Sequence, residues 1–193
     1  MSSGSEALGP GPSRSALASP TAGILASLAV VLAMIVWLRL VGRPFVCPCG
    51  VVKIWQGDLA AAENSQQFSD WYSLLHIVFG MALAGFVAWM KPRWPLGKRA
   101  VTAVVSSALW EGMENTPVLI AMFAHPEGAP AYAGDSILNA TGDTVFVMAG
   151  FFLAARLPVW ATLVIALAAD GLVEFAVHDG FVLGTLRLLG APV

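Results

Sequence analysis

The segment WEGMENTP, residues 110–117, places two carboxylates, an amide and a proline inside an otherwise apolar stretch. It is preceded by AVTAVVSSAL and followed by VLIAMF. Ionisable groups within a membrane segment cost at least a few kcal/mol each and mark functional sites by default. Glu111 and Glu114 can act as a general acid and a general base where their environments differ. This segment therefore predicts an acid–base or ligand-binding site.

Other polar residues recur at helical spacing, three or four positions apart, so that each group forms one stripe along its helix. The three stripes are Glu111, Glu114 and Asn115; Asp135, Asn139 and Asp143; and Asp170, Glu174 and His178. With a rise of 1.5 Å per residue, Glu111 lies about 18 Å from the basic end of its helix, Asp143 about 20 Å and His76 about 22 Å. All three positions lie beyond the midplane of a bilayer core of about 30 Å. We therefore expect the stripes and His76 to face one another across a hydrated cavity that opens to the outer side.

Candidate roles follow from these positions. The predicted catalytic residues are Glu111, Glu114, His76 and Asp143. The predicted cavity or ligand-binding residues are Asn115, Asp135, Asn139, Asp170, Glu174 and His178. A divalent cation can bridge Glu, Asp and His side chains at such a site. The alternative is a structural polar core that only holds helices together.

The segment CPCG contains Cys47 and Cys49, the two cysteines of the chain. They can form a labile redox pair, contribute two thiolates to a metal or cofactor, or remain free thiols. A structural zinc site needs a second Cys or His pair, which is missing here. Structural or redox thiols are therefore favoured over metal ligands.

The elements that carry these residues are apolar helices. The chain has 193 residues, of which 58% are hydrophobic and 11% charged, and its mean hydropathy is +0.76. Continuous apolar runs, without alternation, predict an all-α membrane bundle of about five transmembrane helices plus short interfacial helices. The predicted spans are residues 21–40, 72–90, 100–123, 137–155 and 159–177, and residues 181–193 are expected to form an interfacial or re-entrant helix.

Residues 21–193 are expected to form one integral membrane domain. Residues 1–20 are rich in Ser, Gly and Pro and predict a disordered tail. The basic segment KPRWPLGKR predicts a cytoplasmic turn, and hence a cytoplasmic N-terminus and an outer CPCG segment. Pro117 predicts a kink in the third span. Gly80, Ala84 and Gly85, together with Gly142 and Gly150, predict faces where helices approach closely.

Two functions fit this pattern. One is a membrane-embedded enzyme acting on a lipid or lipid-linked substrate from the outer leaflet. The other is a non-catalytic binding, assembly or small-transporter protein whose cavity holds an ion, a lipid headgroup or a partner helix. The net charge of −2 and the absence of a basic patch exclude a nucleic-acid partner. The sequence names neither a cofactor nor an oligomeric state.

Five blocks together resemble one known family. They are CPCGVVKIWQG, ENSQQFSDWYSLLH, WEGMENTP, GDSILNATGDT and FLAARLPVW. From about Cys47 to Asp179 the chain resembles uncharacterised protein family 0314, also called domain of unknown function 2585, of alphaproteobacterial inner-membrane proteins. The resemblance implies a multi-pass protein of the bacterial inner membrane. It implies no reaction and no catalytic residues.

Overall fold

A computed structural model describes residues 19–58, 60–123 and 132–189. The predicted tail therefore lies almost wholly outside the described residues. The described part is helical, and its helices are α1 (Pro20–Leu40), α2 (Tyr72–Met90), α3 (Leu96–Glu114), α4 (Pro117–Phe123), α5 (Ile137–Ala154), α6 (Val159–Val177) and α7 (Phe181–Leu188).

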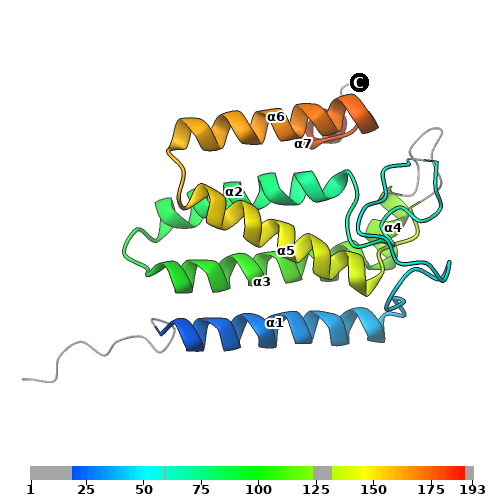
Figure 1. Ribbon diagram of the computed structural model, residues 1–193, viewed down its shortest axis with the longest axis horizontal. Coiled ribbons are helices and arrows are strands. Elements are labelled where there is room, and N and C mark those ends of the chain that lie inside the picture. The colour runs from blue at the N-terminus through cyan, green and yellow to red at the C-terminus, as the bar shows by residue number, and fades with distance from the viewer. Residues whose placement is uncertain (1–18, 59, 124–131, 190–193) are drawn as a thin grey trace, which may run out of the picture.

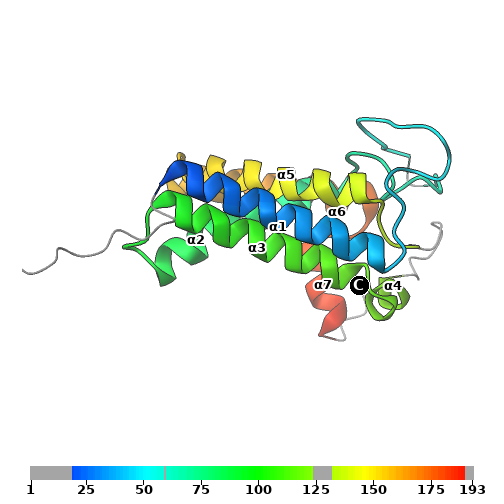
Figure 2. The same ribbon diagram turned by 90° about the horizontal axis from the view of Figure 1, so that it is seen from below.

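The five long helices lie side by side with their axes roughly aligned (Figure 1). The turns from α2 to α3 and from α5 to α6 lie at one end, which we call the basic end because Lys91, Arg93 and Arg156 lie in these turns. Residues 41–71, α4 and α7 lie at the opposite end, which we call the loop end (Figures 1 and 2). The predicted helical bundle is confirmed, and the bounds of α1, α2, α5 and α6 match the predicted spans within one residue at each end.

Four of these helices, α1, α2, α5 and α6, are long and apolar enough to cross a membrane, by length and composition. Helix α3 is not among them, because it contains Lys98 and Arg99 in its first turn and Glu111 and Glu114 in its last turn. It nevertheless packs against α1, α2 and α5 within the bundle. The least apolar of the five long helices is thus covered by apolar neighbours, so that its acidic end faces the interior.

The third helix does not continue to residue 123, as the sequence had suggested. It ends at Glu114, and α4 begins as a separate helix at Pro117 (Figure 2). Proline lacks the N–H that a continuing helix needs, but fits the first turn of a new one. The Asn115 side chain donates a hydrogen bond to the Glu111 carbonyl oxygen over 3.0 Å, which satisfies one of the last carbonyls of α3. The predicted kink is therefore a complete break.

Helices α2 and α5 make the closest helix pair of the bundle. A Cβ added to Gly80 would lie 1.9 Å from the Val147 carbonyl oxygen, and one added to Gly150 would lie 2.0 Å from that of Ile77. Only glycine permits backbones this close. By contrast, a Cβ on Gly85 would meet nothing within 4 Å, so Gly85 is not part of the predicted packing face.

The segment from residue 41 to residue 71 fixes the start of α5. The backbone N–H of Ile137 donates to the Pro44 carbonyl over 2.8 Å, and that of Ser136 donates to the Ser65 carbonyl over 3.0 Å. The Asn139 side chain donates to the Gln67 carbonyl over 2.9 Å. Because the first N–H groups of a helix lack partners within the helix, these bonds anchor α5 against the loop end.

Candidate functional site

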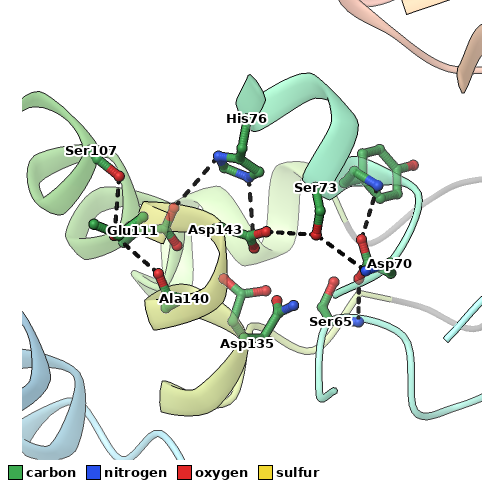
Figure 3. A network of polar contacts seen from close by, with 12 residues as sticks. Ser65, Asp70, Ser73, His76, Ser107, Glu111, Asp135, Ala140 and Asp143 are labelled. Atoms are coloured by element: carbon green, nitrogen blue, oxygen red, sulfur yellow. Dashed lines mark hydrogen bonds and ion pairs between the residues drawn. The ribbon is translucent and has the colours of Figure 1, made fainter. Parts of the chain in front are cut away.

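Three of the four predicted catalytic residues converge inside the bundle near its loop end. His76 comes from α2, Glu111 from α3 and Asp143 from α5 (Figure 3). The His76 Nδ1 atom lies 3.8 Å from Glu111 Oε1, and His76 Nε2 lies 3.7 Å from Asp143 Oδ2. The imidazole thus stands between two carboxylates. We call His76, Glu111 and Asp143 the buried triad.

Glu111 is the most isolated member of the triad. Its relative exposure is 0%, and neither of its carboxylate oxygens has a hydrogen-bond partner among the described residues. Buried polar groups are nearly always hydrogen-bonded, and an unpartnered buried carboxyl carries a large desolvation cost. Packing alone therefore does not account for a buried carboxylate without a partner at this position.

Asp143 is held from the other side by a short chain of hydrogen bonds. The Ser73 hydroxyl donates to Asp143 Oδ1 over 2.9 Å, and the backbone N–H of Asp70 donates to the Ser73 hydroxyl over 3.2 Å. The Asp70 carboxylate in turn accepts the N–H groups of Ser65 and Tyr72. Burial raises the pKa of Asp70, although these backbone N–H groups oppose the shift. Oδ1 of Asp143 is therefore occupied, and Oδ2 faces His76.

A second acidic group adjoins the triad. Ligand atoms of Glu111, Glu114 and Asp135 lie within 4.8 Å of one another, as do those of the buried triad. Asp135 Oδ2 accepts hydrogen bonds from the Asn115 amide over 2.7 Å and from the Tyr132 hydroxyl over 2.9 Å. Burial raises the pKa of Asp135 to about 6, in spite of these hydrogen bonds.

The structure adds two polar partners that the sequence analysis did not single out. Ser73 lies one turn before His76 on α2, so its spacing could have revealed it. Tyr132 precedes Asp135 by three residues in a non-helical segment, where spacing carries no such signal. Both reach the acidic residues through their hydroxyl groups.

Other predicted cavity residues point elsewhere. Asn139 bonds to the loop end, as described above. Asp170 Oδ1 accepts the backbone N–H of Phe181 over 2.9 Å, and Glu174 Oε1 accepts that of Leu183 over 2.9 Å. His178 ends α6 in a left-handed conformation, with a φ of 55°. The polar stripe of α6 therefore holds the turn into α7, where it caps the first N–H groups of that helix.

A groove of about 180 Å³ reaches the buried triad at His76. It is lined by Tyr72, Leu75, His76, Phe79, Trp110, Glu114 and Phe181. Its wall is mainly aromatic and aliphatic, and besides the Tyr72 phenol its ionisable groups are His76 of the triad and the neighbouring Glu114. The groove can therefore receive a molecule with an apolar part and a polar end.

Cys47 and Cys49 are joined by a disulfide at the loop end. Cys47 is buried and Cys49 is exposed. A hollow of about 490 Å³ lies beside them, lined by Arg43, Pro44, Cys47, Pro48, Cys49, Ala62, Glu63, Gln66 and Ala133. It is separate from the groove, with which it shares no lining residue.

Comparison with known proteins places the chain among proteins without an assigned activity. The family described as "Protein of unknown function (DUF2585)" matches residues 38–193. A UPF0314 protein of Sphingopyxis alaskensis is 37% identical over 171 residues, which cover 89% of this chain and 90% of that protein. UPF0314 proteins of Novosphingobium aromaticivorans and Rhizobium etli are 39% and 40% identical, over 86% of this chain and 87% and 85% of theirs. No solved structure matches the chain.

Proposed function

The chain belongs to the DUF2585 family of proteins of unknown function, and we propose that it is a membrane-embedded enzyme that acts on a lipid or lipid-linked substrate. The observation that carries the proposal is the groove, because its largely apolar lining includes His76 and Glu114. A lipid tail would lie along Leu75, Phe79 and Trp110, and its polar headgroup would reach the two ionisable side chains.

The reaction class that these residues support is hydrolysis of an ester or phosphoester bond in the headgroup. Glu114 lines the groove and is placed to take a proton from a water molecule. The water oxygen would then form a bond to the carbonyl carbon or phosphorus, while the bond to the leaving alcohol breaks. The alcohol oxygen receives the proton from Glu114. The nearby buried triad contributes the other ionisable groups of the site, so its protonation state changes the charge around Glu114.

We propose the bacterial inner membrane as the location, with the N-terminus in the cytoplasm. The support is the clustering of Lys91, Arg93, Lys98 and Arg99 at the basic end, because cytoplasmic turns are enriched in Lys and Arg. In this orientation the loop end and the groove face the outer side. The substrate would then enter from the outer leaflet.

A non-catalytic binding protein is the second candidate. The observation that favours it is that the Asp135 and Asp143 side chains already have protein partners, as in a structural network. Such a protein would hold a lipid headgroup or a partner helix in the groove without changing it. The two candidates differ in whether the carboxyl groups must ionise.

The test is a lipid profile of a strain that lacks the gene, compared by mass spectrometry with the parent strain. The strain is complemented with the wild-type protein, Glu111→Gln, Glu114→Gln or Glu174→Gln. The last is a matched control, because Glu174 only accepts a hydrogen bond from α7 and a glutamine oxygen can replace it. The amount of each variant in the membrane and its melting temperature are measured in parallel.

We expect the deletion to accumulate one lipid species that the wild type and Glu174→Gln remove, and that the two site variants leave in place. Restoration by Glu111→Gln and Glu114→Gln would contradict catalysis and support the binding protein. An unchanged lipid profile in the deletion strain would refute the lipid substrate.

A further inference from the structure

We propose that the buried triad binds one divalent transition-metal ion, with His76, Glu111 and Asp143 each giving one ligand atom. This inference does not depend on the proposed function, because an ion can be bound and measured without any substrate. The geometry of these three side chains supports an ion between them.

The distances within the triad are too long for direct hydrogen bonds and leave room for an ion. The two contacts of His76 with the carboxylates, at 3.8 and 3.7 Å, exceed the hydrogen-bond range of about 2.7–3.2 Å. Around a zinc ion with bonds of about 2.0–2.2 Å, neighbouring tetrahedral ligand atoms lie about 3.3–3.6 Å apart. The three ligand atoms of the triad lie within 4.8 Å of one another. The two contacts use different nitrogens of the imidazole, and one ion can bind only one of them. The ion would therefore bind either Nδ1 or Nε2, and side-chain rotation would bring the other carboxylate to the same nitrogen.

Glu111 gives independent support. Its carboxylate is fully buried, has no hydrogen-bond partner among the described residues, and points toward His76 (Figure 3). Protonation would remove its charge but would still leave the new O–H group without an acceptor within hydrogen-bond distance. A bound cation would give the Glu111 carboxylate a bonding partner and would also balance its negative charge.

The Asp143 carboxylate is also oriented to bind a metal ion. Its Oδ1 is held by the Ser73 hydroxyl, and its Oδ2 is the atom that faces His76. Metal-binding carboxylates usually have one such hydrogen bond from a neighbouring group, which orients the free oxygen toward the ion. The Ser73 hydroxyl is itself oriented by the Asp70 N–H.

The cluster of carboxyl groups at the site also favours the binding of a cation. Glu111, Asp143, Glu114 and Asp135 are four carboxyl groups in one region, and no Lys or Arg within the described ranges forms an ion pair with any of them. Arg43 donates instead to the backbone carbonyl groups of Asp135 and Ala133. A divalent ion would offset two of the negative charges.

The triad is a better site than the neighbouring group of Glu111, Glu114 and Asp135. In that group Asp135 Oδ2 already accepts two hydrogen bonds, and no nitrogen ligand is present. The triad combines one imidazole with two carboxylates, a set that suits Zn²⁺ or Mn²⁺ and disfavours Ca²⁺ and Mg²⁺, which prefer oxygen ligands alone. Because His76 also lines the groove, a remaining coordination position can open toward it.

The test uses the full-length protein in detergent, without a polyhistidine tag and stripped with a chelator. Zn²⁺ or Mn²⁺ is added, loosely held ions are removed by gel filtration, and the metal content and melting temperature are measured. Wild type should retain about one ion per chain, and its melting temperature should rise. Glu111→Gln and Asp143→Asn should each weaken the affinity by about tenfold or more, while Glu174→Gln should bind like the wild type.

A spectroscopic measurement identifies the nitrogen ligand independently of stability. With Mn²⁺ bound, pulsed electron paramagnetic resonance should show coupling to an imidazole nitrogen, and His76→Gln should remove it. Retention of far less than one ion by the wild type, with no change in melting temperature, would overturn the proposal. Equal binding by wild type and Asp143→Asn, or a nitrogen coupling that survives His76→Gln, would overturn it too. A protein that binds the ion while the lipid profile is unchanged would refute only the proposed function.

Discussion

Gly80 of α2 lies against the Val147 carbonyl group of α5, so close that an added Cβ would stand 1.9 Å from the oxygen. His76 precedes Gly80 by four residues, and Asp143 precedes Val147 by four. Residues four apart lie on the same face of a helix. The close contact between the two backbones is therefore one helical turn away from the place where His76 meets Asp143, and it sets the distance between them.

Replacement of Gly80 by alanine should separate these helices. The new Cβ would meet backbone rather than a movable side chain, and overpacking of this kind costs about 1–3 kcal/mol or more. Gly85→Ala is the matched control, because a Cβ there meets nothing within 4 Å. Unfolding in a graded detergent mixture should show a loss of stability for Gly80→Ala and none for Gly85→Ala. Equal stability of both variants would mean that the helices separate at little cost.

Most of the fold could be predicted from hydropathy, because long apolar runs have few alternatives to a membrane helix. The bounds of α2 and α6 were predicted to the residue. The third span was not, because its apolar residues continue past Pro117, while the break depends on the Asn115 side chain and on the proline. Hydropathy averages over a window and does not detect such local hydrogen bonds.

The candidate site could be predicted only in part. Spacing brought Glu111 and Asp143 to matching depths, and the structure places both beside His76. Spacing alone could not show which way the α6 stripe faces. Asp170 and Glu174 have the same periodicity as the site residues, yet they accept N–H groups of α7. That choice depends on the short helix that follows, whose position is a tertiary feature.

Asn115 should be important for the junction of α3 and α5. Its amide donates to Asp135 Oδ2 over 2.7 Å, and its oxygen accepts the Asp135 N–H over 2.8 Å. Asn115→Ala leaves the buried Asp135 N–H without its partner and removes one of the two hydrogen bonds to Asp135 Oδ2, which should lower the free energy of unfolding by about 1–3 kcal/mol. Thr162→Ala removes an exposed hydroxyl that bonds only the nearby Pro158 carbonyl, and should stay within about 0.5 kcal/mol of wild type. The melting temperatures of the two variants test this prediction. Similar melting temperatures would show that the junction does not need the Asn115 amide.

Ser73 should act as a positioning residue for the proposed ion. Ser73→Ala removes the hydrogen bond to Asp143 Oδ1 but none of the three ligands, so the affinity for Zn²⁺ should fall by about tenfold. Ser107→Ala is the control, since that buried hydroxyl bonds to Thr144 rather than to the triad. Competition with a fluorescent zinc chelator measures both affinities. An unchanged affinity in Ser73→Ala would contradict the positioning role.

The Lys53–Glu63 pair should weaken at acidic pH. A hydrogen bond from Lys53 holds the pKa of Glu63 below its ordinary value of 4.5. A carboxyl whose pKa is lowered by folding stabilises the folded state above its unfolded pKa, and this contribution is lost as the pH falls through the lower folded value. The protection factors of residues 53–58 and 60–67, which correct the exchange rates for their intrinsic pH dependence, should therefore fall below pH 4.5. In Glu63→Gln the same residues should have lower protection factors at neutral pH, and these should change less with acid. An identical pH profile of protection would show that the pair does not hold the loop.

The orientation of the bundle should follow the basic end. Arg43 and Lys53 lie at the loop end and would oppose this, but Arg43 is bound to backbone carbonyl groups and Lys53 is paired with Glu63. Lys91 and Arg93 lie in an exposed turn, and positive charges in such a turn favour the cytoplasm. After reduction, Cys49 should therefore react with a membrane-impermeant maleimide in intact spheroplasts. A cysteine placed at Pro92, in a protein with Cys47→Ser and Cys49→Ser, should react only after permeabilisation. The reverse pattern would invert the topology and place the groove toward the inner leaflet.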